Sequence, residues 1–125
     1  MAEQKKIPKR SEVRKEDTWA LEDLFATDEL WFEEIRACEK YVDIIRSYKG
    51  KLKEDANMLL EYFRMDTELS LKLSALGNYC YRKADEDMAN GFYKDMCGKY
   101  SELCTKLSAA SSFDTVEILD IRKAC

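Results

Sequence analysis

Hydrophobic residues recur alternately three and four positions apart in three long stretches of the chain. The positions are Trp31, Ile35, Cys38, Val42 and Ile45 in the first stretch, Leu69, Leu73, Leu76 and Cys80 in the second, and Tyr93, Met96, Tyr100, Leu103, Leu107 and Ala110 in the third. This period places the hydrophobic side chains on one face of an amphipathic helix. The pattern therefore predicts three long helices, and no alternating strand pattern competes with it.

The polar residues at the ends of these stretches predict where the helices start and stop. Thr27 or Asp28 is expected to cap the first helix, which should run on to a stop at Gly50. The second helix should open at Glu54 or Asp55, and Asp66 or Thr67 marks a possible break within it. It should end around residues 83–91. Gly77 costs a helix interior about 1 kcal/mol relative to Ala, which a close approach of two helices would explain.

The third long helix is expected to start near Asn90 and to end near Ser111 or Ser112. Asp114 and Glu117 then have the spacing of a capping box, so a further helix is expected there. Few residues remain for it, and a helix this short is not stable without a packing partner. We take this as a hint that the chain is part of something longer.

The first 27 residues have a different character. Residues 1–16 are polar and contain Pro8, so we expect an extended N-terminal arm. Asp17 or Thr18 is expected to cap a short helix after it. The resulting domain division is an arm over residues 1–16 and a helical bundle over residues 17–125.

Composition supports an all-α fold. The 125 residues include one proline and four glycines, so breaks between regular elements should be few. Hydrophobic residues make up 46% of the chain, which is enough to form a core. We therefore predict an antiparallel bundle of three to four long helices, preceded by the arm and the short helix.

Charge and hydropathy exclude several partners. Twenty-one basic and 25 acidic residues are mixed along the chain, which gives no basic surface for nucleic acid. The basic run at residues 5–15 is better explained as a solvated arm than as a phosphate-binding patch. No run of 18 apolar residues exists, so we expect no membrane span. The start of the chain has no hydrophobic signal segment, and we expect a cytoplasmic protein.

The residues that usually carry catalysis are scarce. The chain contains no histidine, which excludes Ser-His-Asp and Cys-His nucleophiles and the His-Glu-x-x-His zinc site. Its five cysteines, at positions 38, 80, 97, 104 and 125, lack metal-ligand spacing and are expected to be reduced core thiols. We predict no catalytic residue, no metal site and no cofactor in this chain, which should not be an enzyme by itself.

Two other groups of residues have structural explanations that fit better than functional ones. The acidic loop at residues 84–91 departs from a calcium-binding EF-hand loop at three positions, and it is expected to be a solvated turn with a helix cap. The remaining group is a set of tyrosines that would either line a ligand groove or belong to the aromatic core, and we favour the core. It comprises Tyr79, Tyr81, Tyr93 and Tyr100.

Four hydrophobic residues near the N-terminus stand among acids and need a partner. Trp19, Leu21, Leu24 and Phe25 lie in the acidic stretch EDTWALEDLFATDELWFEEI, residues 16–35. We expect them to form a hydrophobic patch that packs across the bundle, while the acids face water and cap helices.

The same stretch carries a family resemblance. KRSEVRKEDTWALEDLFATDELW, residues 9–31, resembles the start of the oligoendopeptidase F family, cytosolic zinc metallopeptidases related to thimet oligopeptidase. YKGKL at 48–52, YCYRKADED at 79–87, and SAASSF with VEIL within 108–119 resemble later family segments, in the same order. The resemblance covers nearly the whole chain.

The resemblance implies a helical N-terminal domain that packs on a catalytic domain and shapes the access of short peptides to its channel. In that family the zinc-binding His-Glu-x-x-His helix lies further along the chain, so no zinc ligand is carried over. The patch of Trp19, Leu21, Leu24 and Phe25 becomes a candidate for packing between domains. The alternative is a free-standing helical interaction module that acts as a homodimer. In both cases the isolated chain should expose a large hydrophobic surface, and it should dimerise or be poorly soluble.

Overall fold

The computed structural model describes the backbone of residues 6–124 and the side chains of residues 6–121. Five α-helices follow three short 3-10 turns, and no strand occurs within the described backbone. The turns are η1 (Arg10–Glu12), η2 (Lys15–Asp17) and η3 (Leu21–Asp23). The helices are α1 (Asp28–Glu39), α2 (Tyr41–Ser47), α3 (Ala56–Glu86), α4 (Gly91–Ser111) and α5 (Asp114–Ala124). The predicted all-α class is confirmed.

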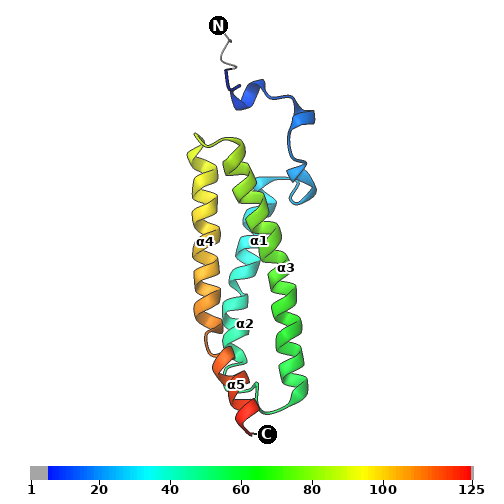
Figure 1. Cartoon of the computed structure of the whole chain (residues 1–125), viewed down its shortest axis with the longest axis vertical. Coiled ribbons are helices and arrows are strands. Elements are labelled where there is room, and N and C mark those ends of the chain that lie inside the picture. The colour runs from blue at the N-terminus through cyan, green and yellow to red at the C-terminus, as the bar shows by residue number, and fades with distance from the viewer. Residues whose placement is uncertain (1–5, 125) are drawn as a thin grey trace.

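The helices form a bundle of three columns (Figure 1). Helices α1 and α2 follow one another along one column, and α3 returns antiparallel to them along the second. Helix α4 then runs antiparallel to α3 and packs against both α3 and α2. The N-terminal turns lie at the end where α3 meets α4, and α5 lies at the opposite end.

Side-chain caps begin the three main helices where the sequence predicted them. The Thr27 hydroxyl accepts a hydrogen bond from the backbone N–H of Leu30, at the start of α1. Asp55 and Asn90 cap α3 and α4 in the same way, through the second backbone N–H of each helix. Gly50 has a φ of 81°, a conformation that glycine adopts without strain, and it lies in the turn after α2.

Two predicted boundaries inside the helices are wrong. The first helix is interrupted at Lys40, whose N–H donates to the carbonyl of Cys38 instead of extending the ladder. Lys40 keeps helical φ and ψ angles, so α1 and α2 stay in line and the hydrophobic stripe continues across the break. Conversely, α3 continues through residues 65–67. The Thr67 hydroxyl donates to the carbonyl of Phe63 within the helix and therefore does not cap a new one.

Two predicted caps are also wrong. The short helix after the arm is only the single turn η3, and the Thr18 hydroxyl donates to the Lys15 carbonyl instead of capping it. At the start of α5, Asp114 and Glu117 do not form a capping box. The Asp114 carboxylate accepts from the Tyr62 hydroxyl, and the Glu117 carboxylate accepts from the Gly50 N–H. Both carboxylates thus accept hydrogen bonds from residues distant in the sequence, instead of from the local backbone N–H groups that a capping box would use.

The core lies between the three columns and centres on Trp31. This side chain is fully buried, and its indole N–H donates to the Leu76 carbonyl at 2.9 Å. A carbonyl inside α3 thereby gains a second partner, and the indole N–H is not left unsatisfied. The other fully buried large side chains are Leu52, Tyr62, Leu76, Met96 and Leu103.

Helices α3 and α4 approach closely at Gly77, as its position within a helix suggested. A Cβ atom at residue 77 would lie 2.8 Å from the Tyr100 hydroxyl oxygen and 2.9 Å from its ring carbon Cζ. A side chain at residue 77 would therefore displace the Tyr100 ring, and the cost of glycine to the helix is offset by the packing of α3 on that ring.

We predict that Gly77→Val lowers the free energy of unfolding by about 1–3 kcal/mol, because the added methyl groups push Tyr100 out of place. Gly98→Val is the matched control, since nothing lies within 4 Å of a Cβ atom at that helical position. It should change stability by only a few tenths of a kcal/mol. Urea unfolding followed by circular dichroism measures both, and equal midpoints for the two variants would contradict the packing described here.

Candidate functional site

The four residues of the candidate packing patch are divided between the core and the surface. Leu21, in turn η3, is buried, and Phe25 is half-buried with its ring edge-on to Tyr79, 5.4 Å between centroids. These two side chains hold the segment before α1 against α3. Their hydrophobicity is therefore used within the chain itself.

Trp19 and Leu24 face outward. The Trp19 side chain is 53% exposed, and the guanidinium of Arg82 lies 5.3 Å from the centre of its ring, a cation–π contact. Leu24 is 43% exposed and lines a shallow hollow with Leu30 and Ala37 of α1. These two members of the patch offer the most surface to a partner, and the half-buried Phe25 lines the same hollow as Leu24.

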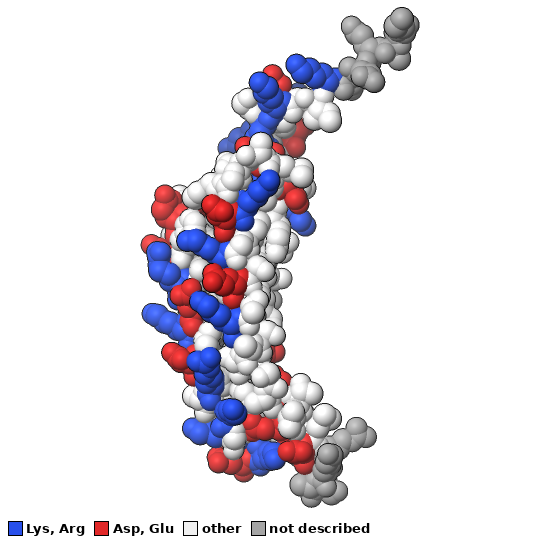
Figure 2. Space-filling view, turned by 90° about the vertical axis from the view of Figure 1, so that its left-hand side faces the viewer, with Lys and Arg blue, Asp and Glu red and all other residues white. Residues whose placement is uncertain are grey.

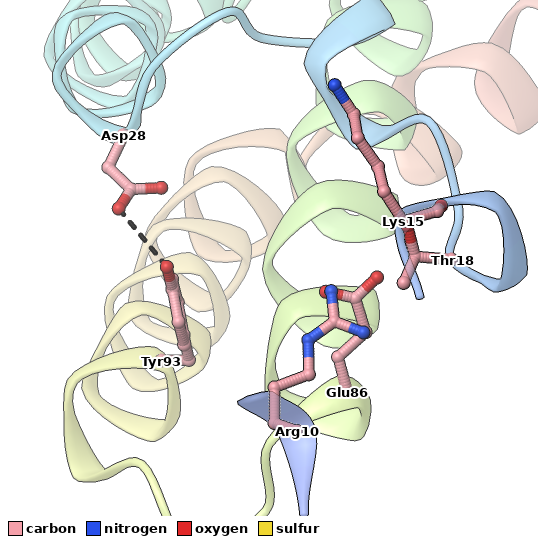
Figure 3. A network of polar contacts seen from close by, with 6 residues as sticks. All are labelled: Arg10, Lys15, Thr18, Asp28, Glu86 and Tyr93. Carbon is pink, nitrogen blue, oxygen red and sulfur yellow. Dashed lines mark hydrogen bonds and ion pairs between the residues drawn. The ribbon is translucent and has the colours of Figure 1, made fainter. Parts of the chain in front are cut away.

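A polar network ties the start of α1 to α3 and α4 through Asp28, and Figure 3 shows its contact with Tyr93 of α4. One carboxylate oxygen of Asp28 accepts from the Tyr79 hydroxyl at 2.6 Å, and the other accepts from the Tyr93 hydroxyl at 3.4 Å. The ammonium group of Lys83 lies 5.5 Å and 5.7 Å from the centres of these two rings. Burial and the Asp28 carboxylate both raise the pKa of Tyr79 and of Tyr93. The network joins three helices and presents no free reactive group.

The tyrosines of the sequence pattern do not gather into one groove. Tyr79 and Tyr93 belong to the Asp28 network, whereas the rings of Tyr81 and Tyr100 pack edge-on against each other at 5.8 Å. The favoured interpretation as part of the aromatic packing agrees with this arrangement.

The N-terminal segment is fixed to the bundle by an ion pair that the sequence did not reveal. The Arg10 guanidinium lies 2.7 Å from a carboxylate oxygen of Glu86, whose side chain is only 8% exposed (Figure 3). Residues 10 and 86 are joined here by folding alone, and no local pattern pairs them. The described part of the arm, which includes turns η1 and η2, is thus attached to the end of α3.

The residues present do not fit a zinc centre. The sequence supplies no histidine, and residues 6–121 contain no group of three or more His, Cys, Asp or Glu side chains able to hold a metal ion. The loop at residues 84–91 contains the Asn90 cap of α4, as predicted. The zinc that the family resemblance implies has no ligand set in this part of the chain.

The cysteines are thiols of the core and of its edge. Cys38 and Cys80 are fully buried, and desolvation raises their pKa values to about 11 and about 12. Cys97 and Cys104 are half-buried, and all four are unpaired. The fifth, Cys125, lies outside the described residues. The two buried thiols keep their protons at neutral pH and are poor nucleophiles.

None of the helices within residues 6–124 combines the length and the hydrophobicity needed to cross a lipid bilayer.

Comparison with known proteins relates the chain to a family of peptidases. Oligopeptidase PepF of Bacillus subtilis is 37% identical over 98% of this chain, and Group B oligopeptidase PepB of Streptococcus agalactiae is 30% identical over 92%. The chromosomal oligoendopeptidase F of Lactococcus lactis is 27% identical over 90%. The chain spans only 19% of the length of each of these relatives. No protein-family model and no solved structure matches it. Over the segment that it shares with these enzymes, the chain belongs to the oligoendopeptidase F family.

Proposed function

We propose that the chain is the N-terminal, non-catalytic helical domain of an oligoendopeptidase F-type enzyme. In this role it packs on the catalytic part and shapes the access of short peptides to its channel. One observation carries the proposal: three oligopeptidases match at least 90% of this chain over 19% of their own length. The rest of each relative is then available for catalysis.

The side chains of this chain support a role without chemistry. The family resemblance implies a zinc-dependent peptidase, and zinc in such a site is bound by histidine and carboxylate ligands. With no histidine in its sequence, this chain relies on the rest of the enzyme for those ligands. Its two buried thiols are unpaired, as is usual in the reducing cytoplasm, the compartment that we propose for it.

The outward-facing members of the packing patch are proposed to contribute to the contact with the catalytic part. Trp19 and Leu24 lie on the segment that the Arg10–Glu86 ion pair and the Leu21 anchor hold against α3. A hydrophobic side chain held on a fixed segment loses little entropy on binding, which favours its use in an interface.

A second candidate function is a free-standing interaction module that forms a homodimer. Exposed hydrophobic side chains such as Leu71, at 70%, and Val116, at 62%, favour this alternative. Size-exclusion chromatography with light scattering separates the two candidates. A stable dimer that does not associate with an oligopeptidase lacking the matching segment would favour the module.

The proposal predicts that this chain can replace the matching segment of Bacillus subtilis PepF. A full-length chimera with residues 1–125 in place of that segment should be monodisperse and should hydrolyse a short fluorogenic peptide at a rate within about tenfold of PepF, a loss of about 1.4 kcal/mol in transition-state stabilisation. The matched control is PepF with the segment deleted, which should be inactive or insoluble. A folded chimera without hydrolysis would contradict the proposal.

A further inference from the structure

Charged residues are distributed unevenly around the bundle. In the view toward α4, Lys, Arg, Asp and Glu gather on the left of the molecule, and a band without charge runs along the right for much of its length (Figure 2). Charged residues make up 37% of the chain, so an exposed band of this length without them calls for an explanation.

Two helical stripes of exposed uncharged residues occur on α3 and α4. Thr67, Leu71 and Ser74 are exposed along α3, and Ser101, Thr105 and Ser108 are exposed along α4. Within each stripe the spacing is three and four residues, so each lies on one face of its helix. We call these six residues the uncharged face.

The two stripes lie side by side. Between them, Gly77 of α3 contacts the Tyr100 ring of α4, and the ring of Tyr81 packs against the same tyrosine. A groove of about 210 Å³ runs along the contact and is lined by Ser70 and Ser108 among others, with Asp66 as its charged residue. The uncharged residues of the two helices therefore border a common groove, in which Asp66 is the one charged lining residue.

Three charged residues of α4 point to another side. Lys99, Glu102 and Lys106 line a hollow together with Arg36 and Glu39 of α1. Water solvates these groups on the α1 side, while the α3 side of the same helix carries serine, threonine and glycine. Helix α4 therefore has a hydrophobic face toward the core, a charged exposed side toward α1 and an uncharged exposed side toward α3.

We propose that the uncharged face is the surface on which the rest of an oligoendopeptidase F polypeptide packs. This inference rests on the proposed function and specifies its contact surface. The fully buried part of a protein interface is depleted of charge, and small side chains on α4 permit the close approach of a second backbone. Leu71, exposed at 70% in the middle of α3, supplies a hydrophobic anchor for that contact.

The relatives indicate which partner would cover the uncharged face. Each of the three oligopeptidases continues well beyond the segment that it shares with this chain, which is 19% of its length. By contrast, the exposed ring of Trp19 is already in contact with the guanidinium of Arg82. We assign the main contact to α3 and α4, with Trp19 and Leu24 at its margin.

Cysteine labelling tests this assignment. Leu71→Cys and Ser108→Cys place a thiol on the uncharged face, and Ile44→Cys places one on α2 at a position with 41% exposure. Each variant is treated with a maleimide, alone and within the PepF chimera, and modification is read at each site by peptide mass spectrometry. Positions 71 and 108 should react at least about tenfold more slowly in the chimera, because a covered thiol reacts only through transient opening. Position 44 should react at the same rate in both proteins.

Labelling tests the contact surface, and peptide hydrolysis by the chimera tests the proposed function. The two measurements are independent, so either proposal can be contradicted without the other. Loss of hydrolysis in a folded chimera counts against the proposed function. If positions 71 and 108 react at the same rate in the isolated chain and in a chimera that hydrolyses peptide, the assignment of the face alone is overturned. Protection of residue 71 in the isolated chain, with a dimer mass by light scattering, would assign the face to a second copy and would also overturn the inference.

Discussion

Replacing Trp31 by alanine is expected to lower the free energy of unfolding by about 3–5 kcal/mol. The side chain is fully buried at the centre of the bundle, and its indole N–H donates to the Leu76 carbonyl of α3. The substitution removes a large hydrophobic contact area, leaves a cavity and breaks this hydrogen bond. Since small domains are stable by about 5–15 kcal/mol in total, the variant should be close to unfolding at 37 °C.

The second tryptophan is the matched control. Trp19 is 53% exposed and its recorded contact is the cation–π interaction with Arg82, so Trp19→Ala should cost only about 0.5–1 kcal/mol. Urea unfolding followed by circular dichroism compares the two variants directly. Similar losses for both variants would show that the core does not centre on Trp31.

Stability is expected to fall steeply above pH 9. Burial is the main cause of the raised pKa values of Cys38, Cys80, Tyr62 and Tyr79 in the folded chain, compared with ordinary values of 9.0 for cysteine and 10.0 for tyrosine. Between the ordinary and the raised pKa, the unfolded chain loses these protons and the folded chain keeps them. Ionisation therefore favours the unfolded state, by about 1.4 kcal/mol per pH unit for each group. Below pH 9 these four groups are protonated in both states and have no such effect.

Urea unfolding at pH 8, 9, 10 and 11 measures this dependence. Tyr62→Phe removes one of the four groups, together with its hydrogen bond to Asp114, so the variant starts less stable and loses stability with a shallower slope above pH 10. A free energy of unfolding that stays constant from pH 8 to pH 11 would contradict the burial of these side chains.

The helices were predictable because their signals are local. The hydrophobic period identified the buried faces of α1, α3 and α4, and Thr27, Asp55 and Asn90 mark helix starts through hydrogen bonds that span two or three residues. Such contacts depend only on neighbours in the sequence, so a single sequence contains the information.

The errors occurred where a distant residue competes with a local one. Asp114 and Glu117 have the spacing of a capping box, but folding brings Tyr62 to the first and Gly50 to the second. The ion pair between Arg10 and Glu86 is equally invisible along the chain.

The candidate patch is divided between the core and the surface for a related reason. Residues 19–25 contain hydrophobic side chains among acids. Their composition does not determine which side chains face the core and which face the surface. Leu21 faces the core and Leu24 faces out, because the single turn η3 has no longer helical period to align them. The uncharged face has no hydrophobic period in the sequence, because serine and threonine form most of it.

We propose that these helices are a scaffold and that the catalytic residues lie elsewhere in the enzyme. The most direct measurement is hydrolysis of a short fluorogenic peptide by the purified 125-residue chain, with added Zn²⁺ and with a chelator, beside the PepF chimera. We expect no cleavage above the buffer blank by the chain alone and zinc-dependent cleavage by the chimera. Zinc-dependent cleavage by the chain alone, abolished by the chelator, would contradict this proposal.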